Sequence, residues 1–203
     1  MNDQCLLIIL AKAPLPGQVK TRLAPAIGLE GAARLAGVML ANTLQQAVAS
    51  NIGPVELCCA PDCGHWQFGQ AVCSGVCISE QGAGDLGERM ERAFSRALAS
   101  YARVVLIGTD APQLDGAILR RAAQALLAHD VVIAPATDGG YVLIGLARRA
   151  PALFQSIAWS TAQVMAQTRA RIDALGMSLH ELPTLHDVDE PHDLVHVPAA
   201  WLA

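Results

Sequence analysis

Short apolar runs of strand length alternate with amphipathic helical patterns along nearly the whole chain. Fully apolar runs bounded by turns are typical of strands buried on both faces of a parallel sheet. The runs predict strands at Leu6–Leu10, Val55–Ala60, Ile78–Glu80, Val104–Gly108, Val131–Ala134, Tyr141–Leu146 and Leu179–Leu182. The intervening patterns predict helices at Leu29–Ser50, Leu86–Ala97, Ile118–Leu127 and Val164–Leu175. Asp85 and Glu88 predict a capping box at the start of the second helix, Ser160 or Thr161 is the predicted cap of the last helix, and Gly176 is its predicted end. The prolines and glycines of residues 11–28 predict irregular structure before the first helix. The alternation therefore predicts an α/β fold, with residues 1–203 forming a single domain whose mainly parallel sheet is flanked by helices.

The composition agrees with one globular domain. The 203 residues are 53% hydrophobic, which is enough to bury a core without disulfides or metal. The formal net charge of -4 would repel the phosphates of a nucleic acid. The longest uninterrupted apolar run, Cys5–Ala11, is far below the roughly 20 residues of a spanning helix, and the preceding Met-Asn-Asp-Gln lacks the basic start of a signal peptide. We expect a cytoplasmic protein with no nucleic-acid or membrane partner.

Five of the six cysteines lie close together between residues 58 and 77. Four-residue steps separate Cys59 from Cys63 and Cys73 from Cys77, which resembles a zinc site. Structural zinc normally uses two-residue gaps on tight turns, however, and Cys59 and Cys77 fall in expected strands. We therefore interpret these residues as reduced, mostly buried thiols.

Four loops are expected to meet at one edge of the sheet. In parallel sheets, ligands bind beyond the carboxyl ends of the strands, where the connections diverge. The loops that follow the expected strands at this edge are residues 12–25, 81–88, 109–115 and 137–141, the last joined by 187–193. The sequence thus predicts a ligand site built from distant segments.

The first of these loops is basic. The chain has only two lysines, Lys12 and Lys20, and both lie in this loop together with Arg22. Cations beside a glycine at the edge of a sheet are typical of phosphate binding, although the loop fits neither the GxxxxGK[ST] nor the GxGxxG pattern. A solvated basic loop is the alternative. The predicted nucleotide- or phosphate-binding residues are Lys12, Gly17, Lys20, Arg22, Gly84 and Asp85.

Acidic residues at two strand ends could hold a metal ion. Asp110 directly follows an apolar strand, and Asp187 and Asp189 lie together near the end of the chain. Magnesium needs only one or two protein carboxylates when phosphates and water complete its shell. Asp110 could instead serve a turn, and Asp189, before Glu190 and a proline, could cap a helix. These alternatives make Asp187 the freer candidate ligand beside Asp110.

A second surface is a candidate acceptor site. The predicted residues are Asp138, Gly139, Gly140, Tyr141 and Trp159. Two successive glycines allow a ligand to approach the backbone closely, but the Asp-Gly-Gly sequence also suits a hairpin turn. The tryptophan precedes a helix and could equally pack there as a hydrophobic staple. The six histidines show no metal-binding or catalytic-triad spacing.

The segments AKAPLPGQVKTRL, QGAGDLGERM, LIGTDAPQL, DGGYVLIGL, WST and DVDEPHDL, taken in order, resemble the radical-SAM/selenodomain-associated transferase 1 family. That family is similar to 2-phospholactate and molybdenum-cofactor guanylyltransferases. The resemblance implies a GT-A-like nucleotide-diphospho-sugar transferase fold. It implies phosphate contacts for Lys12, Lys20 and Arg22 and metal contacts for Asp110, Asp187 and Asp189.

The chain also departs from these relatives. It lacks the GxSxRMG loop of the molybdenum-cofactor enzymes, and DGGYVLIGL is unlike the corresponding phospholactate segment. It has Asp-x-Pro where many sugar transferases have Asp-x-Asp. The acceptor therefore cannot be transferred from either relative.

Together these features predict a transferase that depends on Mg²⁺ or Mn²⁺ and uses a nucleotide donor. Nucleotidyl transfer from a nucleoside triphosphate to a small-molecule acceptor is the leading hypothesis, with Lys20, Arg22 and Asp110 as catalytic residues. Sugar transfer from a nucleotide sugar is the first alternative, and a non-catalytic nucleotide-binding module is the second. The base, the acceptor and the oligomeric state stay open.

Overall fold

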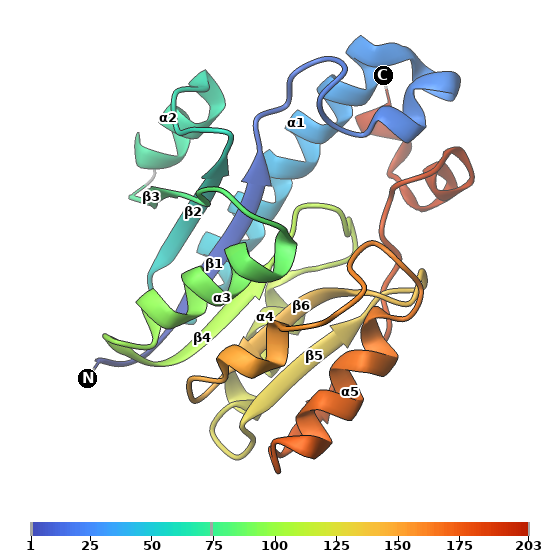
Figure 1. The fold of residues 1–203 in the computed structure, drawn as a ribbon. Coiled ribbons are helices and arrows are strands. Elements are labelled where there is room, and N and C mark those ends of the chain that lie inside the picture. The colour runs from blue at the N-terminus through green and yellow to red at the C-terminus, as the bar shows by residue number, and fades with distance from the viewer. Residues whose placement is uncertain (1, 74, 203) are drawn as a thin grey trace.

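The strands form one seven-stranded sheet in the order β3-β2-β1-β4-β6-β5-β7. The structure is a computed structural model that describes residues 2–73 and 75–202, and the side chains of these except at 2, 3 and 73 (Figure 1). The strands are β1 Asn2–Lys12, β2 Val55–Ala60, β3 Cys77–Glu80, β4 Tyr101–Ile107, β5 Val131–Pro135, β6 Tyr141–Leu146 and β7 Leu179–Glu181. β6 is antiparallel to both of its neighbours, and the other pairs are parallel. The predicted mainly parallel α/β fold is confirmed.

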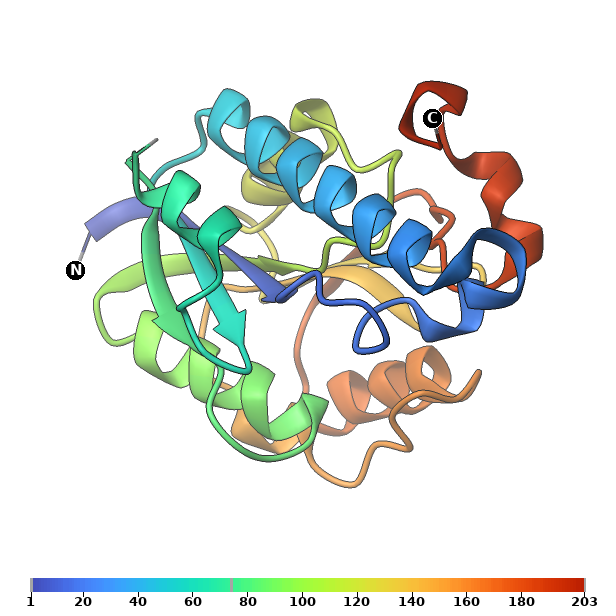
Figure 2. The same cartoon turned by 90° about the horizontal axis from the view of Figure 1, so that it is seen from above.

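Helices cover both faces of the sheet (Figure 2). They are α1 Ala24–Ser50, α2 Trp66–Cys73, α3 Leu86–Ala97, α4 Gly116–Ala125 and α5 Val164–Ala174. Short 3-10 turns are η1 Thr21–Leu23, η2 Pro151–Phe154, η3 Pro191–His196 and η4 Ala199–Trp201. Successive side chains of β1 alternate between two cores, with Leu7 in the core under α1, α2 and α4, and Ile8 in the core under α3 and α5. Burial on both faces explains why the strands are apolar throughout.

Two predicted helix ends are confirmed by their hydrogen bonds. Asp85 Oδ1 accepts from the Glu88 amide at 2.9 Å, and Glu88 Oε2 accepts from the Asp85 amide at 2.8 Å, which completes a capping box on α3. Gly176 ends α5 with a φ of 59°. The cap expected at Ser160 or Thr161 is wrong, because α5 has Gln163 at its N-cap with no capping side chain.

The first loop is more ordered than expected. Its prolines and glycines predicted irregular structure up to residue 28, but η1 and the first turn of α1 lie within it. Gly28, with a φ of 72°, puts a kink in α1 instead of preceding it. The short helix α2 was not predicted, because its eight residues make too few turns for a clear periodic pattern.

The segment Thr21–Ser50 meets the length and hydropathy test for a membrane span, with a mean hydropathy of 1.3. In the 18-residue stretch of this segment that has this mean hydropathy, 44% of the residues are buried inside the protein, because α1 packs on the sheet and on α4. The search for uninterrupted apolar runs did not identify this segment as a candidate span, because its apolar residues are interspersed with polar ones. Core helices of globular proteins pass the same test.

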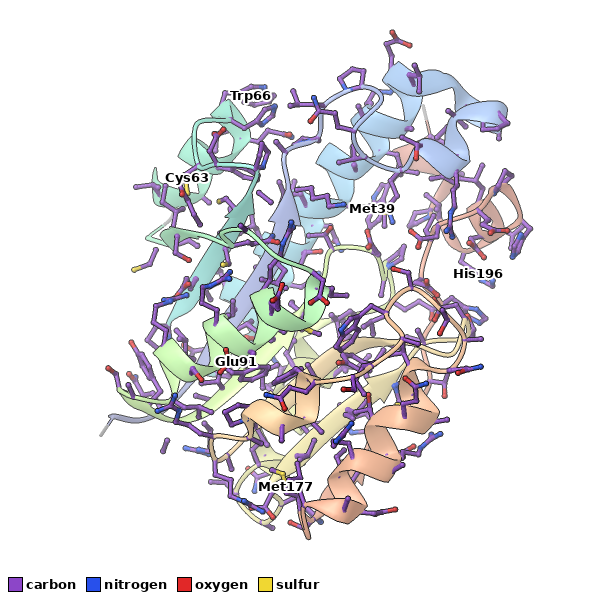
Figure 3. The ribbon with its side chains drawn as sticks, viewed as in Figure 1. Met39, Cys63, Trp66, Glu91, Met177 and His196 are labelled. Carbon is purple, nitrogen blue, oxygen red and sulfur yellow. The ribbon has the colours of Figure 1, made fainter. Side chains whose placement is uncertain are left out.

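A third, small core joins the C-terminal segment to α1. Figures 1 and 2 both show the 3-10 turns near the C-terminus beside the start of α1, and Figure 3 marks the two elements by Met39 and His196. The buried members of this core are Leu23, Ala32, Leu35, Met39, Val188 and Val197. The core therefore holds the C-terminal segment against the end of the basic loop.

Cys5, Cys58, Cys59, Cys63 and Cys77 are free thiols. The side chain of Cys73 lies outside the described residues. Among the residues that the structure describes, no three histidine, cysteine or acidic side chains are grouped as a metal site would require.

Candidate functional site

Lys20 lies at the centre of the charged cluster at the carboxyl edge of the sheet. Its Nζ is 2.5 Å from Asp110 Oδ1 and 2.8 Å from Asp189 Oδ1, and it donates to the Val188 carbonyl at 2.6 Å. The lysine side chain is only 7% exposed, whereas the two aspartates are about half exposed. One buried cation thus joins the basic loop, the end of β4 and the C-terminal segment.

Backbone pairing brings the C-terminal segment to this position. Beyond β7 the chain continues along β5, with a bridge between Ala136 and Leu185. The Val188 amide then donates to the Asp110 carbonyl at 2.9 Å. Asp110 follows β4, which lies beside β1, so the sheet order places all three segments at one edge. The predicted meeting of these distant loops is confirmed.

The electrostatics of Lys20 favour its charged form. Burial alone would lower the pKa of Lys20, but the carboxylates of Asp110 and Asp189 more than offset burial, so the pKa lies above its usual value. The lysine therefore stays charged and keeps both carboxylates paired.

The C-terminal aspartates have different partners. Asp189, predicted as a metal ligand with a helix cap as the alternative, is the aspartate that contacts Lys20. The cap of η3 is Glu190, which forms a capping box with Asp193. Asp187, expected to be the freer metal ligand, lies outside the Lys20 ion pairs. Burial, followed by the nearby carboxylate of Asp138, raises the pKa of Asp187 to about 6.

The remaining residues of the basic loop are accessible. Lys12 is exposed at the end of β1. Arg22 is 67% exposed, and its Nη1 lies 3.8 Å from Glu190 Oε1. Gly17 has a φ of 75°, and nothing lies within 4 Å of the position that a Cβ would take. Lys12 and Arg22 are thus the two cations of this loop that are exposed to an anionic ligand, although Arg22 also pairs with Glu190.

Gln81 and Arg92, which were not predicted from the sequence, hold the loop before α3 in place by hydrogen bonds. Gln81 is buried, and its amide nitrogen donates to Ala11 O at 3.1 Å and to Cys58 O at 2.9 Å. Arg92 donates to the carbonyls of Gln81 and Ala83. A lone glutamine after a strand carries no signal that distinguishes it from a solvated residue.

The two residues predicted from this loop have different surroundings. Gly84 is exposed, with a φ of 106°, and its carbonyl accepts from Arg89 Nε at 2.9 Å. The carboxylate of Asp85 is occupied by the helix cap and occupies the place at the start of α3 where a phosphate would bind. The structure therefore supports a capping role for Asp85 and not a phosphate contact.

Three of the predicted acceptor residues, Gly139, Tyr141 and Trp159, have packing contacts inside the protein. A Cβ added to Gly139 would lie 2.7 Å from the Cα of Ala162. The absence of a side chain at Gly139 therefore allows the two backbone segments to pack closely. The Tyr141 hydroxyl lies 4.0 Å from Met90 Sδ, which directs it into the core instead of toward an acceptor. Trp159 packs edge-on against Tyr141 at 6.4 Å between ring centroids.

Asp138 is the exposed residue of the predicted acceptor surface, and Gly140 beside it is partly exposed. Asp138 Oδ1 accepts from the Gly140 amide at 2.7 Å within the turn. The turn lies near the C-terminal segment, because the Thr137 amide donates to Leu185 O at 3.1 Å and Asp138 acts electrostatically on Asp187. This turn is therefore adjacent to the C-terminal segment that carries Asp189.

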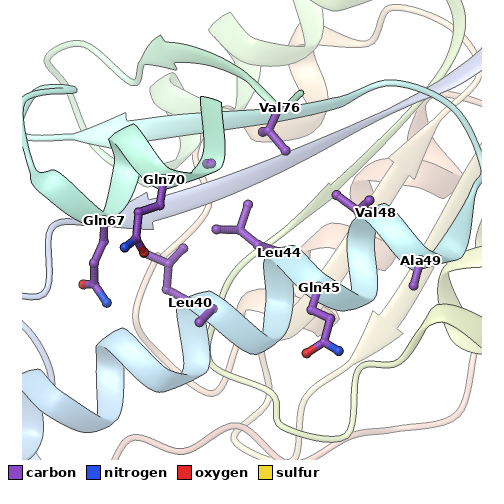
Figure 4. Close-up of a pocket in the computed structure, with 10 residues that line it drawn as sticks. Leu40, Leu44, Gln45, Val48, Ala49, Gln67, Gln70 and Val76 are labelled. Carbon is purple, nitrogen blue, oxygen red and sulfur yellow. The ribbon is translucent and has the colours of Figure 1, made fainter. Parts of the chain in front are cut away.

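A cavity of about 460 Å³ lies elsewhere, between α1 and α2 (Figure 4). Its lining is apolar apart from the amides of Gln45, Gln67 and Gln70. The cavity offers no charged group to a phosphate, so the candidate site is the Lys20 cluster and not this cavity.

The chain belongs to the family described as "uncharacterized protein conserved in bacteria (DUF2064)", which matches residues 43–161. No curated protein matches it. A crystal structure from Desulfovibrio desulfuricans G20, provisionally named a nucleotide-diphospho-sugar transferase, is 32% identical over 95% of this chain and 85% of that chain, with a TM-score of 0.85.

More distant structures share the fold alone. A nucleotidyl transferase from Methanothermobacter thermautotroptrophicus is 12% identical over 99% of both chains, with a TM-score of 0.62. The manganese complex of Rv0371C from Mycobacterium tuberculosis H37Rv is 17% identical over 93% of both chains, with a TM-score of 0.55. These matches confirm the nucleotide-diphospho-sugar transferase-like fold. Membership of the radical-SAM-associated family stays a prediction.

Proposed function

We propose that the protein is a divalent-metal-dependent transferase that uses a nucleotide donor and transfers a nucleotidyl group from a nucleoside triphosphate to a small acceptor. The observation that carries the proposal is the convergence of Asp110 and Asp189 on one cation, beside the exposed Lys12 and Arg22. The fold, shared with nucleotide-using transferases, supports it.

The residues at this position fit a divalent ion. Magnesium and manganese prefer oxygen ligands, and two aspartate oxygens lie within 2.8 Å of one positively charged atom. The lysine ammonium occupies the position that a metal ion on these two carboxylates would take. The manganese complex of the Mycobacterium protein of the same fold supports a divalent metal as the cofactor.

In this proposal, different residues of the chain bind the phosphates, hold the metal and face the acceptor. The guanidinium of Arg22 offers a fork of donors to phosphate oxygens, and Lys12 offers a point charge at the end of β1. Both would stabilise negative charge on a departing pyrophosphate. When bound, a metal on Asp110 and Asp189 would supply further neutralisation of phosphate charge. The turn at Asp138 borders this position and would face the acceptor.

Sugar transfer from a nucleotide sugar is the second candidate, favoured by the provisional name of the 32% identical structure. The density of cations favours nucleotidyl transfer, because a departing pyrophosphate carries more charge than the nucleoside diphosphate that leaves a nucleotide sugar.

The test begins with a thermal-shift screen of nucleoside triphosphates and nucleotide sugars, with and without Mg²⁺ or Mn²⁺, because bound ligand raises apparent stability. The donors that bind are then incubated with a panel of sugar phosphates, phosphorylated acids and alcohols. Pyrophosphate and a nucleotide-linked product are expected, and Asp110→Ala should abolish both. Asp173→Ala, an exposed aspartate on α5, is the matched control. Release of nucleoside diphosphate from a nucleotide sugar, with no pyrophosphate from any triphosphate, would replace the proposal with sugar transfer.

A further inference from the structure

The Lys20 ammonium is fully engaged by protein oxygens. An ammonium has three N–H donors, and Lys20 has three acceptors within 2.8 Å: Asp110 Oδ1, Asp189 Oδ1 and the Val188 carbonyl. It therefore has no donor left for a phosphate. The predicted contact between Lys20 and the donor phosphate cannot form without breaking one of these bonds.

Lys20 also occupies the place of the proposed metal. A divalent cation on the two Oδ1 atoms would take the oxygens that the ammonium holds at 2.5 and 2.8 Å, and one on the Oδ2 atoms of the same carboxylates would still lie close to the ammonium. In either case the two cations would share the same pair of carboxylates in a partly buried site, where their mutual repulsion is strong. Lysine and metal therefore compete for one position.

We propose that Lys20 is the resident cation of the free protein and that a donor polyphosphate draws its ammonium away, so that the divalent metal enters only with the nucleotide. This inference rests on the proposed function. It makes Lys20 a gate for the metal as well as a partner of the phosphates.

The backbone conformation of Lys20 is consistent with a residue that its side-chain contacts hold in place. Its φ of 49° and ψ of 36° are left-handed, a conformation that is disfavoured for residues with a Cβ. The side-chain contacts with Asp110 and Asp189 compensate for that cost in the free protein. Val19 beside it and Leu23 are buried, so we expect the loop backbone to stay in place and the ammonium to leave by rotation of the Lys20 side chain.

The first experiment removes the resident cation. Lys20→Met keeps the length of the side chain but not its charge, and Mn²⁺ binding without nucleotide is measured by electron paramagnetic resonance. We expect the variant to bind Mn²⁺ at least about tenfold more tightly than the wild type, since no internal cation competes. Lys12→Met removes the other lysine and should leave metal binding without nucleotide unchanged.

Circular dichroism checks that Lys20→Met is folded. If the folded variant binds Mn²⁺ no better than the wild type, Lys20 is not the resident cation. If the Mn²⁺ affinity of Lys12→Met rises as much as that of Lys20→Met, the loss of any positive charge explains the effect, and the inference is also overturned.

The second experiment uses the wild-type chain and does not depend on a stable variant. Because the chain has only two lysines, selective nitrogen-15 labelling of lysine gives two ammonium signals, which Lys12→Met assigns. We expect the Lys20 signal to shift when an α,β-methylene analogue of a nucleoside triphosphate is added, and to stay unchanged with Mn²⁺ alone.

The outcomes separate the two proposals. An analogue that binds without moving the Lys20 signal would overturn the gate and leave the proposed function standing. If none of the triphosphate analogues binds, with or without Mn²⁺, the proposed function and the release step fail together, and Lys20→Met still decides whether the lysine is the resident cation.

Discussion

Lys20 Nζ lies 2.8 Å from Asp189 Oδ1, although the two residues are 169 positions apart in the chain. The contact joins the basic loop to the C-terminal segment, and the small core that contains Leu23 and Val188 packs the same two segments together. The loop and the C-terminal segment therefore form one site. A ligand that binds one of them must act on the other.

We predict that Arg22→Ala weakens the binding of a nucleoside triphosphate by about tenfold or more and leaves the binding of the nucleoside nearly unchanged. The reason is that we expect the exposed guanidinium of Arg22 to meet the phosphates and not the base. Isothermal titration calorimetry measures both affinities. Arg121→Ala, on the exposed face of α4, is the control for loss of charge. An equal loss for triphosphate and nucleoside would contradict the prediction.

We predict that Asp110→Asn strongly reduces the paramagnetic broadening that Mn²⁺ causes in the resonances of a bound nucleotide. An amide lacks the negative charge that a hard cation prefers, so metal affinity should fall about tenfold or more. Asp173→Asn on α5 should leave the broadening at its wild-type level. Undiminished broadening in Asp110→Asn would remove this residue from the metal site.

We predict that Gly139→Ala lowers the free energy of unfolding by about 2–4 kcal/mol, because a left-handed φ of 92° is combined with a Cβ clash against Ala162. Gly176→Ala should cost only about 1 kcal/mol, since its φ is 59° but nothing lies within 4 Å of the added atom. Urea unfolding measures both. Similar losses for the two variants would mean that the chain near Ala162 yields easily, contrary to the close approach seen here.

We predict that Arg96→Met destabilises the protein by about 1–2 kcal/mol at neutral pH. Arg96 Nη1 donates to Glu56 Oε2 at 2.9 Å, and Glu56 is only 7% exposed. Arg169→Met breaks a more exposed pair with Glu181 and should cost less than about 1 kcal/mol.

The loss in Arg96→Met should depend on pH. Burial alone would raise the pKa of Glu56, but hydrogen bonds from Arg96 and Ser79 outweigh burial and hold it below its ordinary value of 4.5. The pair's contribution to stability is therefore complete above pH 4.5 and disappears as the pH falls through the lowered pKa. Urea unfolding at pH 7 and in the acid range tests this, and a wild-type advantage that grows on acidification would show that the sign is wrong.

Most of the fold could be predicted from local patterns. The apolar runs located the strands, because a strand buried on both faces tolerates few polar residues, as at Leu6–Leu10 within β1. The capping box at Asp85 and the stop at Gly176 were predictable, since both depend on hydrogen bonds or torsions within a few residues. The helix α2 and the cap of α5 were missed, because their signals are short or lack a capping side chain.

The sequence by itself determined which chemistry is present: two lysines in one loop, an aspartate after a strand and a group of aspartates near the end of the chain. Only the tertiary structure decided their pairing. It put Lys20 on Asp110 and Asp189, left Asp187 beside Asp138, and turned the Tyr141 hydroxyl toward the core. The physical reason is that these contacts depend on the order of strands in the sheet and on the path of the chain beyond β7, which no local pattern specifies.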